Sequence, residues 1–342
     1  MIVNYNTLKM ISTTPKLFLS RPLNIGIIGT GYAAQRRAET LLKDERSRLC
    51  YVSGHTPENL ANFCQTYHTS PCDSWEALIN HRDLDLVVIC NINRDHGEIA
   101  RRALEAGKHV IIEYPLALNF SEASEILALA TQKNLLLHIE HIEILGGMHQ
   151  TTRQYLPQLG NVFYGRYTTI QPVRTVPRRW TFHREMFGFP FMAALPRIHR
   201  FTDLFGEVNS VLCHDRFWDA PDIGYYTAFL CHASLGFKSG LQVDLVYGKG
   251  DAFWQSDRTF ELYGDRGTLI FKGETGTLIT QEGEKTLELE SRRGLFAQDT
   301  QMVLDHLFEG KPLYIDPKSS LYALKIAEAA DQSSQLGQLI EV

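Results

Sequence analysis

The sequence predicts an α/β protein in which an N-terminal parallel sheet is followed by an α+β domain with a large, mostly antiparallel sheet. Three observations predict this fold class. The chain has 342 residues, enough for two typical domains. Apolar strand-like segments alternate with helical segments up to about residue 140. Beyond that point, strand-like segments joined by turn residues dominate.

The N-terminal part is expected to form successive β-α units. A strand over 23–29 precedes a helix over 32–43 and a second strand over 49–53. Strands that are apolar throughout have no solvent-facing side, so they indicate a parallel sheet covered by helices on both faces. The alternation continues with strands at 86–90, 109–112 and 135–139 and helices at 95–106 and 121–132.

Beyond residue 141 the pattern changes to successive strands. Turns such as Gly264-Asp265-Arg266-Gly267 separate them, which is typical of antiparallel hairpins. A helix is expected over 192–204, and two closing helices over 298–308 and 319–333. The expected strands cover 163–170, 208–217, 226–237, 240–247, 259–263, 268–271, 277–279 and 286–289.

Composition and charge exclude several classes of protein. Hydrophobic residues make up 44% and charged residues 21%, as in folded globular chains. The net charge of −5 provides no positive field for nucleic acid, and no apolar run approaches the roughly 18 residues that span a membrane. The six cysteines form no C-x-x-C pair, so we expect buried thiols in a reducing compartment, without disulfides or structural zinc.

A glycine-rich turn follows the first strand and opens the first helix. Gly29, Gly31 and Ala34 form the pattern G-x-G-x-x-A, with Tyr32 and Ala33 between the last two. In this setting the first glycine permits a tight turn and the second lets the backbone approach a pyrophosphate, while the small third residue packs the helix closely. The motif therefore predicts a Rossmann domain that binds a dinucleotide.

The end of the second strand indicates which dinucleotide is bound. The segment there contains Ser53 and His55 but no carboxylate for the ribose hydroxyls. Donors without a repelling acid favour the 2′-phosphate of NADPH, and Arg36 or Arg37 of the first helix lies within reach of it. For either arginine, a solvent-exposed helix face is an equally good interpretation.

These patterns divide the chain into four parts: an N-terminal extension at 1–21, the Rossmann domain at 22–140, a substrate-binding domain at 141–315 and a C-terminal helix at 316–342. We expect a cytoplasmic protein that is a monomer or a small homo-oligomer. Residues 1–21 contain basic and hydroxyl side chains but no acid. They are expected to be a flexible tail; if they are instead a transit peptide, the protein belongs in an organellar stroma.

Two further segments carry a resemblance to a known family. Asn91, Asn93 and His96 follow the third long strand in an N-x-x-x-x-H pattern, and Glu113-Tyr114-Pro115 follows the next strand. Both segments resemble landmark motifs of the glucose-fructose/inositol dehydrogenase-like oxidoreductases. The resemblance implies that Asn91, Asn93, His96 and Glu113 lie at the cofactor. The family's E-K-P lysine is a tyrosine here, and its D-x-x-x-H helix is absent, so sugar or cyclitol oxidation is not expected.

These departures resemble one branch of the family, the biliverdin reductases, most closely those of cyanobacteria. The matching segments are 29–39, 107–110, 113–118, 137–143, 187–190 and 197–206. The resemblance implies NADPH-dependent reduction of biliverdin to bilirubin by hydride transfer to the central methine carbon. It implies catalytic roles for Arg197 and Tyr114, and substrate contacts from Arg200, Glu140, His141 and Phe189.

The residue types are compatible with that chemistry. Biliverdin is a planar tetrapyrrole with two propionates, and residues 171–200 interleave arginines with aromatic side chains. Arginine is a poor acid, so Arg197 is expected to stabilise developing charge or to orient a water; a structural salt bridge is the alternative. Tyr114 either donates a hydrogen bond or simply forms a wall of the site.

Other interpretations concern a possible metal site and the function of the whole chain. His138 and His141 do not have the four-residue helical spacing of a zincin motif, so we expect no metal site. A reductase for another substrate in the same fold remains an alternative, because fold does not fix function. A non-catalytic protein that senses NADP is a second alternative.

Overall fold

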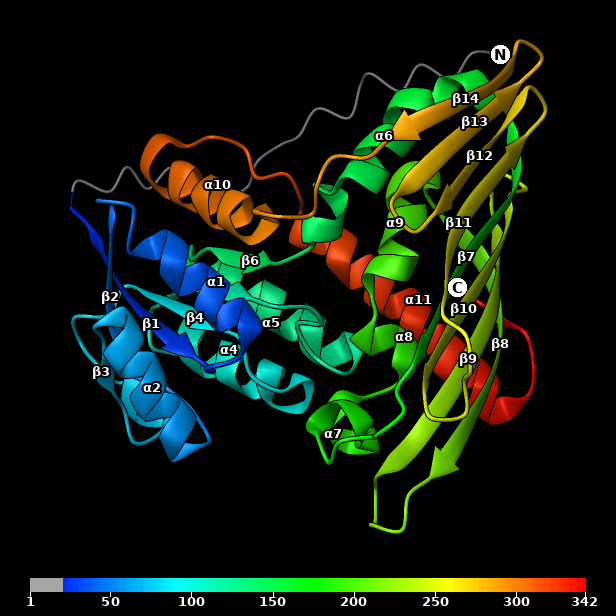
Figure 1. The fold of residues 1–342 in the computed structure, drawn as a ribbon. Helices are drawn as coiled ribbons and strands as arrows, with labels where there is room; N and C mark the ends of the chain where they lie inside the picture. The colour runs from blue at the N-terminus through cyan, green and yellow to red at the C-terminus, as the bar shows by residue number, and fades with distance from the viewer. Residues whose placement is uncertain (1–20) are drawn as a thin grey trace.

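The computed structural model describes residues 21–342, so residues 1–20 of the expected N-terminal extension lie outside the described part. Two sheets dominate the structure. Figure 1 shows the first, with its helices, beside a second, larger and curved sheet. Within residues 21–342, no helix is both long and apolar enough to cross a membrane.

The first sheet has six parallel strands in the order β3-β2-β1-β4-β5-β6. Its central strands are almost wholly buried, because helices cover both faces. The strands are β1 (Leu23–Ile28), β2 (Ser47–Ser53), β3 (Ser70–Pro71), β4 (Leu86–Ile89), β5 (His109–Ile112) and β6 (Leu137–Ile139). The helices are α1 (Tyr32–Leu41), α2 (Pro57–Tyr67), α3 (Trp75–Ile79), α4 (His96–Glu105) and α5 (Phe120–Lys133).

The second sheet has nine strands in the order β14-β13-β12-β11-β7-β10-β9-β8-β15. All neighbours are antiparallel except β7 and β10. Its strands are β7 (Val162–Pro172), β8 (Val208–Asp219), β9 (Tyr226–Phe237), β10 (Gln242–Gly250), β11 (Asp257–Gly264), β12 (Gly267–Lys272), β13 (Thr275–Thr280), β14 (Gly283–Glu288) and β15 (Ile340–Glu341). The helices of this half are α6 (Gly147–Tyr155), α7 (Arg184–Phe187), α8 (Pro190–Ala193), α9 (Pro196–Phe205), α10 (Leu295–Glu309) and α11 (Pro317–Leu336).

Two apolar clusters connect these layers. The larger one runs from one face of the first sheet, through α5, α9 and α11, to the second sheet, so the two halves share a core. The smaller one fills the other face of the first sheet under α1 and α2, and α10 contributes Val303, Leu304 and Leu307 to it. Figure 1 shows the consequence: after β14 the chain crosses back, and α10 lies against α1.

The structure confirms the predicted fold class, a parallel sheet followed by a mostly antiparallel one. Six elements were not expected from the sequence: the short β3, β15, α3 and α7, and the longer helices α2 and α6, with 11 and 9 residues. The helix expected at 192–204 is interrupted: α8 ends at Ala193, and Pro196 begins α9 at a position where its missing N–H is not needed.

Candidate active site

A cleft of about 1320 Å³ lies at the carboxyl ends of the first sheet's strands and extends to the loops of the second half. This is the edge of a parallel sheet where ligands of such folds bind. The lining residues fall into three groups. At the nucleotide end they are 28–33, 53–56, 73–76 and 90–96; in the middle, Glu113, Tyr114, Glu140, Ile142, Glu143, Arg292 and Phe296; at the far end, Arg178, Arg179, Trp180, Met186, Phe187, Ala193 and Tyr225.

The glycine turn has the geometry that a dinucleotide requires. Gly29 has a φ of +117°, and a Cβ there would lie 2.4 Å from the carbonyl oxygen of Cys90, so only glycine fits. A Cβ on Gly31 would meet nothing within 4 Å, which leaves the backbone open to the cleft. Helix α1 begins at Tyr32, and the N–H groups of its first turn have no helical acceptors. The loop and the helix start therefore fit a pyrophosphate.

The end of β2 offers donors and no acid to the cleft. Ser53 is buried, whereas His55 and Thr56 are exposed, and all three line the cleft. Arg36 does not line it; its guanidinium pairs with Glu39 at 2.5 Å on the surface of α1. At the end of β2, the polar groups that face the cleft are therefore those of residues 53–56.

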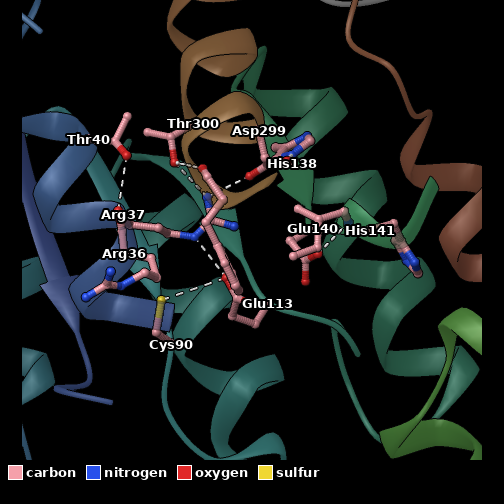
Figure 2. A network of polar contacts seen from close by, with 12 residues as sticks. Arg36, Arg37, Thr40, Cys90, Glu113, His138, Glu140, His141, Asp299 and Thr300 are labelled. Atoms are coloured by element: carbon pink, nitrogen blue, oxygen red, sulfur yellow. Dashed lines mark hydrogen bonds and ion pairs between the residues drawn. The ribbon is translucent and has the colours of Figure 1, made fainter. Parts of the chain in front are cut away.

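Arg37 is the centre of a buried ionic network, and its expected contact with a 2′-phosphate does not fit this position. The side chain is 0% exposed and does not line the cleft. Its Nε donates to Glu113 Oε1 at 2.8 Å, and its Nη1 donates to Asp299 Oδ2 at 2.6 Å (Figure 2). Asp299, which lies on α10, holds the guanidinium of Arg37 inside the protein and away from the cleft.

Asp299 anchors that network from the far end of the chain. Its Oδ1 is 2.7 Å from both His138 Nε2 and the Tyr314 hydroxyl. Burial alone would raise the pKa of Asp299, but the interactions with His138 and Arg37 outweigh it and hold the pKa well below its ordinary value. The carboxylate is therefore charged, and α10 is fixed to the helix that follows the glycine turn.

Glu113 and Tyr114 follow β5 and both line the cleft, as expected for residues beside the nicotinamide end of a cofactor. The ring of Tyr114 lies 5.6 Å from that of His141, roughly parallel to it. Burial raises the pKa of Tyr114 well above its ordinary value, and the carboxyl group of Glu140 raises it further. The phenol therefore keeps its proton at neutral pH.

The segment after β4 shapes the loop between cofactor and substrate. His96 is buried, with Nδ1 2.7 Å from the carbonyl oxygen of Pro115 and Nε2 3.3 Å from that of Asn91. Asn93 donates from Nδ2 to the carbonyl oxygen of Phe187 at 2.9 Å. These bonds tie the cofactor loop both to the Glu113-Tyr114-Pro115 turn and to the second half of the protein.

Glu140 and His141 follow β6 but differ in position. Glu140 lines the cleft while almost fully buried, and its Oε1 accepts from the backbone N–H of Ile142 at 2.5 Å. Burial raises its pKa well above the ordinary value, and the carboxylates of Glu113 and Asp299 add to the effect. His141 does not line the cleft; its Nε2 is 2.7 Å from Ser320 Oγ, so the expected substrate contact does not fit its buried position.

The arginines of α9 lie on the aromatic face of the second sheet. The guanidinium carbon of Arg197 lies 3.9 Å from the ring centre of Tyr247, and Nε is buried without a hydrogen-bond partner. Its positive charge acts on Tyr114, where it lowers the pKa against the effect of burial. Arg200 is 1% exposed, with Nη2 3.4 Å from Glu143 Oε2. Arg197, Arg200 and Phe189 do not line the cleft. The direct substrate contacts expected of Arg200 and Phe189 therefore do not fit their positions.

The sequence analysis missed several residues that the fold brings to the cleft. Phe296 lines it from the start of α10, and Trp75 lines it from the start of α3. Tyr225 comes from the hairpin between β8 and β9. None of them belongs to a local motif, because long-range packing places them.

Comparison with known proteins gives the family background. Residues 23–141 match the NAD-binding Rossmann domain of an oxidoreductase family, and residues 157–342 match the C-terminal alpha/beta domain of that family. The structure is similar to that of biliverdin reductase from Synechocystis sp. PCC 6803, solved in complex with biliverdin and NADP⁺. That similarity has a TM-score of 0.91 and 52% identity, and it covers 92% of this chain and 99% of the other.

Two curated mammalian proteins are also similar. Biliverdin reductase A of Mus musculus is 31% identical over 59% of this chain and 63% of its own length. Biliverdin reductase A of Homo sapiens is 26% identical over 56% of this chain and 61% of its own length. The chain thus spans less than two thirds of each of these curated relatives.

Proposed function

The chain belongs to the oxidoreductase family defined by that Rossmann domain and its C-terminal alpha/beta domain, and from this membership we propose that it reduces biliverdin to bilirubin with NADPH. One observation carries the proposal. The chain is 52% identical, across nearly its whole length, to a biliverdin reductase whose structure holds biliverdin and NADP⁺. The curated mammalian relatives bear the same name.

The nucleotide end of the cleft supports NADPH as the reductant. The N–H groups at the start of α1 would hold the pyrophosphate, with Gly31 providing close approach. Ser53, His55 and Thr56 would donate to the 2′-phosphate, and the segment 53–56 carries no carboxylate that would repel it. When bound, NADPH supplies the hydride.

The proposed reaction adds one hydride and one proton to the substrate. The hydride forms a C–H bond at the central methine carbon, the electron pair of the broken double bond moves toward a pyrrole nitrogen, and a proton from water or from an acid completes bilirubin. NADP⁺ is the other product. The electron movement places negative charge on the tetrapyrrole, so the enzyme must provide a cation or a proton donor there.

Arg197 is the residue that we propose for this role. Its guanidinium lies over an aromatic ring, with no carboxylate from residues 21–342 in ion-pair contact, so its charge is available to the substrate. Arg197 does not itself line the cleft, but its positive charge acts on the phenol of Tyr114, which does. We assign Tyr114 to positioning, because a phenol with a raised pKa is a weak acid at neutral pH.

A direct assay tests the proposal. The purified full chain is mixed with biliverdin and NADPH, and the absorbance spectrum is followed over time. We expect the biliverdin band to decrease while a bilirubin band appears, with one NADPH consumed for each bilirubin formed. Omission of NADPH is the control.

A different result would move the assignment to one of the alternatives. NADPH oxidation with another carbonyl or conjugated substrate, and no change of the biliverdin bands, would indicate a reductase for that substrate. Tight binding of NADPH with no turnover of any candidate substrate would favour a protein that senses the cofactor.

A further inference from the structure

Lys249 is a half-buried cation whose surroundings contain aromatic rings and another cation. It does not itself line the cleft, whereas Phe187, which its side chain faces, does. Lys249 lies on β10, one residue before the strand ends, and its Nζ is 4.3 Å from the ring centre of Phe182 and 5.8 Å from that of Phe187. Within residues 21–342, it makes no ion pair with a carboxylate. Burial first, and then the positive charge of Arg179, lower the pKa of Lys249 to about 8.

Arg179 brings the second positive charge to the same place. The segment after β7 folds back over the end of β10, where Val173 N–H donates to the carbonyl oxygen of Gly250 at 3.0 Å. The carbonyl oxygen of Arg179 accepts from Phe182 N–H at 2.9 Å, so the backbone of Arg179 lies one turn from Phe182, whose ring faces Lys249 Nζ. Arg179 is exposed and lines the far end of the cleft, and in the described part of the chain it too forms no ion pair with a carboxylate.

Neighbouring arginines of this region are already engaged. Arg178 Nε lies 3.4 Å from Asp222 Oδ2, and Arg184 Nη2 lies 2.6 Å from Asp219 Oδ1. Arg174 donates to the carbonyl oxygen of Trp254 at 2.9 Å. Arg179 is close enough to Lys249 for its charge to lower the pKa of the lysine. Two cations without a counter-ion repel each other, and an anion bound between them removes that repulsion. The pair is therefore suited to an anionic group of a ligand.

We propose that Lys249 and Arg179 bind a carboxylate of the substrate, with Phe187 and Trp180 providing an apolar wall for the attached ring system. Both aromatic residues line the cleft next to Arg179. The ligand class is a flat, conjugated molecule that carries a propionate, and the assignment to biliverdin rests on the proposed function. The two propionates of biliverdin flank its central methine carbon. Holding one of them fixes where that carbon lies relative to the cofactor.

Equilibrium binding to the NADP⁺-loaded protein tests this site without turnover. The titrants are biliverdin and its dimethyl ester, which has the same ring system without the negative charges. We expect Lys249→Gln and Arg179→Gln each to raise the Kd of biliverdin about 10- to 100-fold, because each removes a charged hydrogen-bond donor to a carboxylate. The Kd of the ester is expected to change less than about threefold.

Matched variants separate the carboxylate site from general effects of charge or folding. Arg174→Gln removes one positive charge from the same segment, outside the cleft lining, and is expected to leave both Kd values unchanged. Lys249→Arg keeps the charge and is expected to restore most of the biliverdin affinity. If Lys249→Gln does not fold, Arg179→Gln decides, since that side chain is exposed and its loss leaves the core intact.

The outcomes distinguish this inference from the proposed function. Equal weakening of biliverdin and the ester, or no weakening of either, overturns the carboxylate site. Selective weakening of biliverdin in a protein that does not reduce it with NADPH supports the carboxylate site and rejects the proposed reaction. Absence of bilin binding to the unaltered protein rejects the site directly.

Discussion

In the nucleotide half of the cleft, Arg37 is enclosed between the carboxylates of Glu113 and Asp299. In the substrate half, Arg197 and Lys249 lie over aromatic rings, and the described residues provide neither with an ion-pair partner. Both regions hold positive charge that is at least half-buried, but only the first neutralises it within the protein. A cation that already has its anions supports the structure, whereas a cation resting on rings stays available to an anionic ligand.

The first prediction concerns the neutralised region. Arg37→Met should lower the free energy of unfolding by about 3–5 kcal/mol, because it leaves two carboxylates buried without their common cation. Urea unfolding followed by circular dichroism measures the change. Arg36→Met is the matched control, expected to cost less than about 0.5 kcal/mol, since its pair with Glu39 is near the surface. Equal stability of the two variants would show that the Arg37 network adds nothing to the fold.

The second prediction concerns the region without internal partners. Arg197→Ala should lower kcat about 100- to 1,000-fold while the Kd of biliverdin changes much less, because the developing charge on the tetrapyrrole loses its cation. Stopped-flow absorbance with saturating NADPH measures kcat. Arg197→Lys should restore little, since a point charge does not reproduce the planar fork. Normal turnover with weakened biliverdin binding would instead make Arg197 a carboxylate-binding residue.

The same contrast explains how much of the site the sequence could predict. The glycine turn and the Glu113-Tyr114-Pro115 segment are local motifs at strand ends, and Gly29, Gly31, Glu113 and Tyr114 line the cleft. The burial of Arg37 depends on Asp299, which is 262 residues away in the sequence. No local pattern indicates that α10 returns to pack on α1, so the sequence favours either a phosphate contact or a solvent-exposed helix face for Arg37, and neither fits its burial.

Lys249 shows the same limit in the substrate half. The sequence predicts a strand over 240–247, which ends two residues before Lys249, whereas β10 continues to Gly250. The segment that follows β7 passes the end of β10 and brings Phe182 to Lys249. This arrangement depends on the conformation of a loop, which the sequence pattern does not indicate. The sequence indicated an arginine-rich aromatic segment. The structure pairs Arg178, Arg184 and Arg200 with carboxylates, whereas Arg174, Arg179 and Arg197 have no such partner within residues 21–342.

A third prediction places a new negative charge in the nucleotide half. Ser53→Asp should shift the ratio of kcat/KM for NADPH to that for NADH about 10- to 100-fold toward NADH, because a carboxylate at the end of β2 repels a 2′-phosphate. Steady-state kinetics with both cofactors measures the ratio. Ser53→Asn, similar in size but uncharged, is the control and should shift it far less. An unaltered protein that already prefers NADH would contradict the 2′-phosphate assignment.

The smallest effect is expected at Tyr114, which stands between the two regions. Its raised pKa keeps the phenol protonated and makes it a reluctant proton donor, so Tyr114→Phe should retain kcat within about tenfold. The ring itself remains, and with it the stacking on His141. Single-turnover rates measured with NADPH already bound isolate this step from cofactor binding. Suppose the rate falls as far as in Arg197→Ala while NADP⁺ affinity is unchanged. The phenol would then be the group that delivers the proton, and Arg197 would act by lowering the pKa of Tyr114.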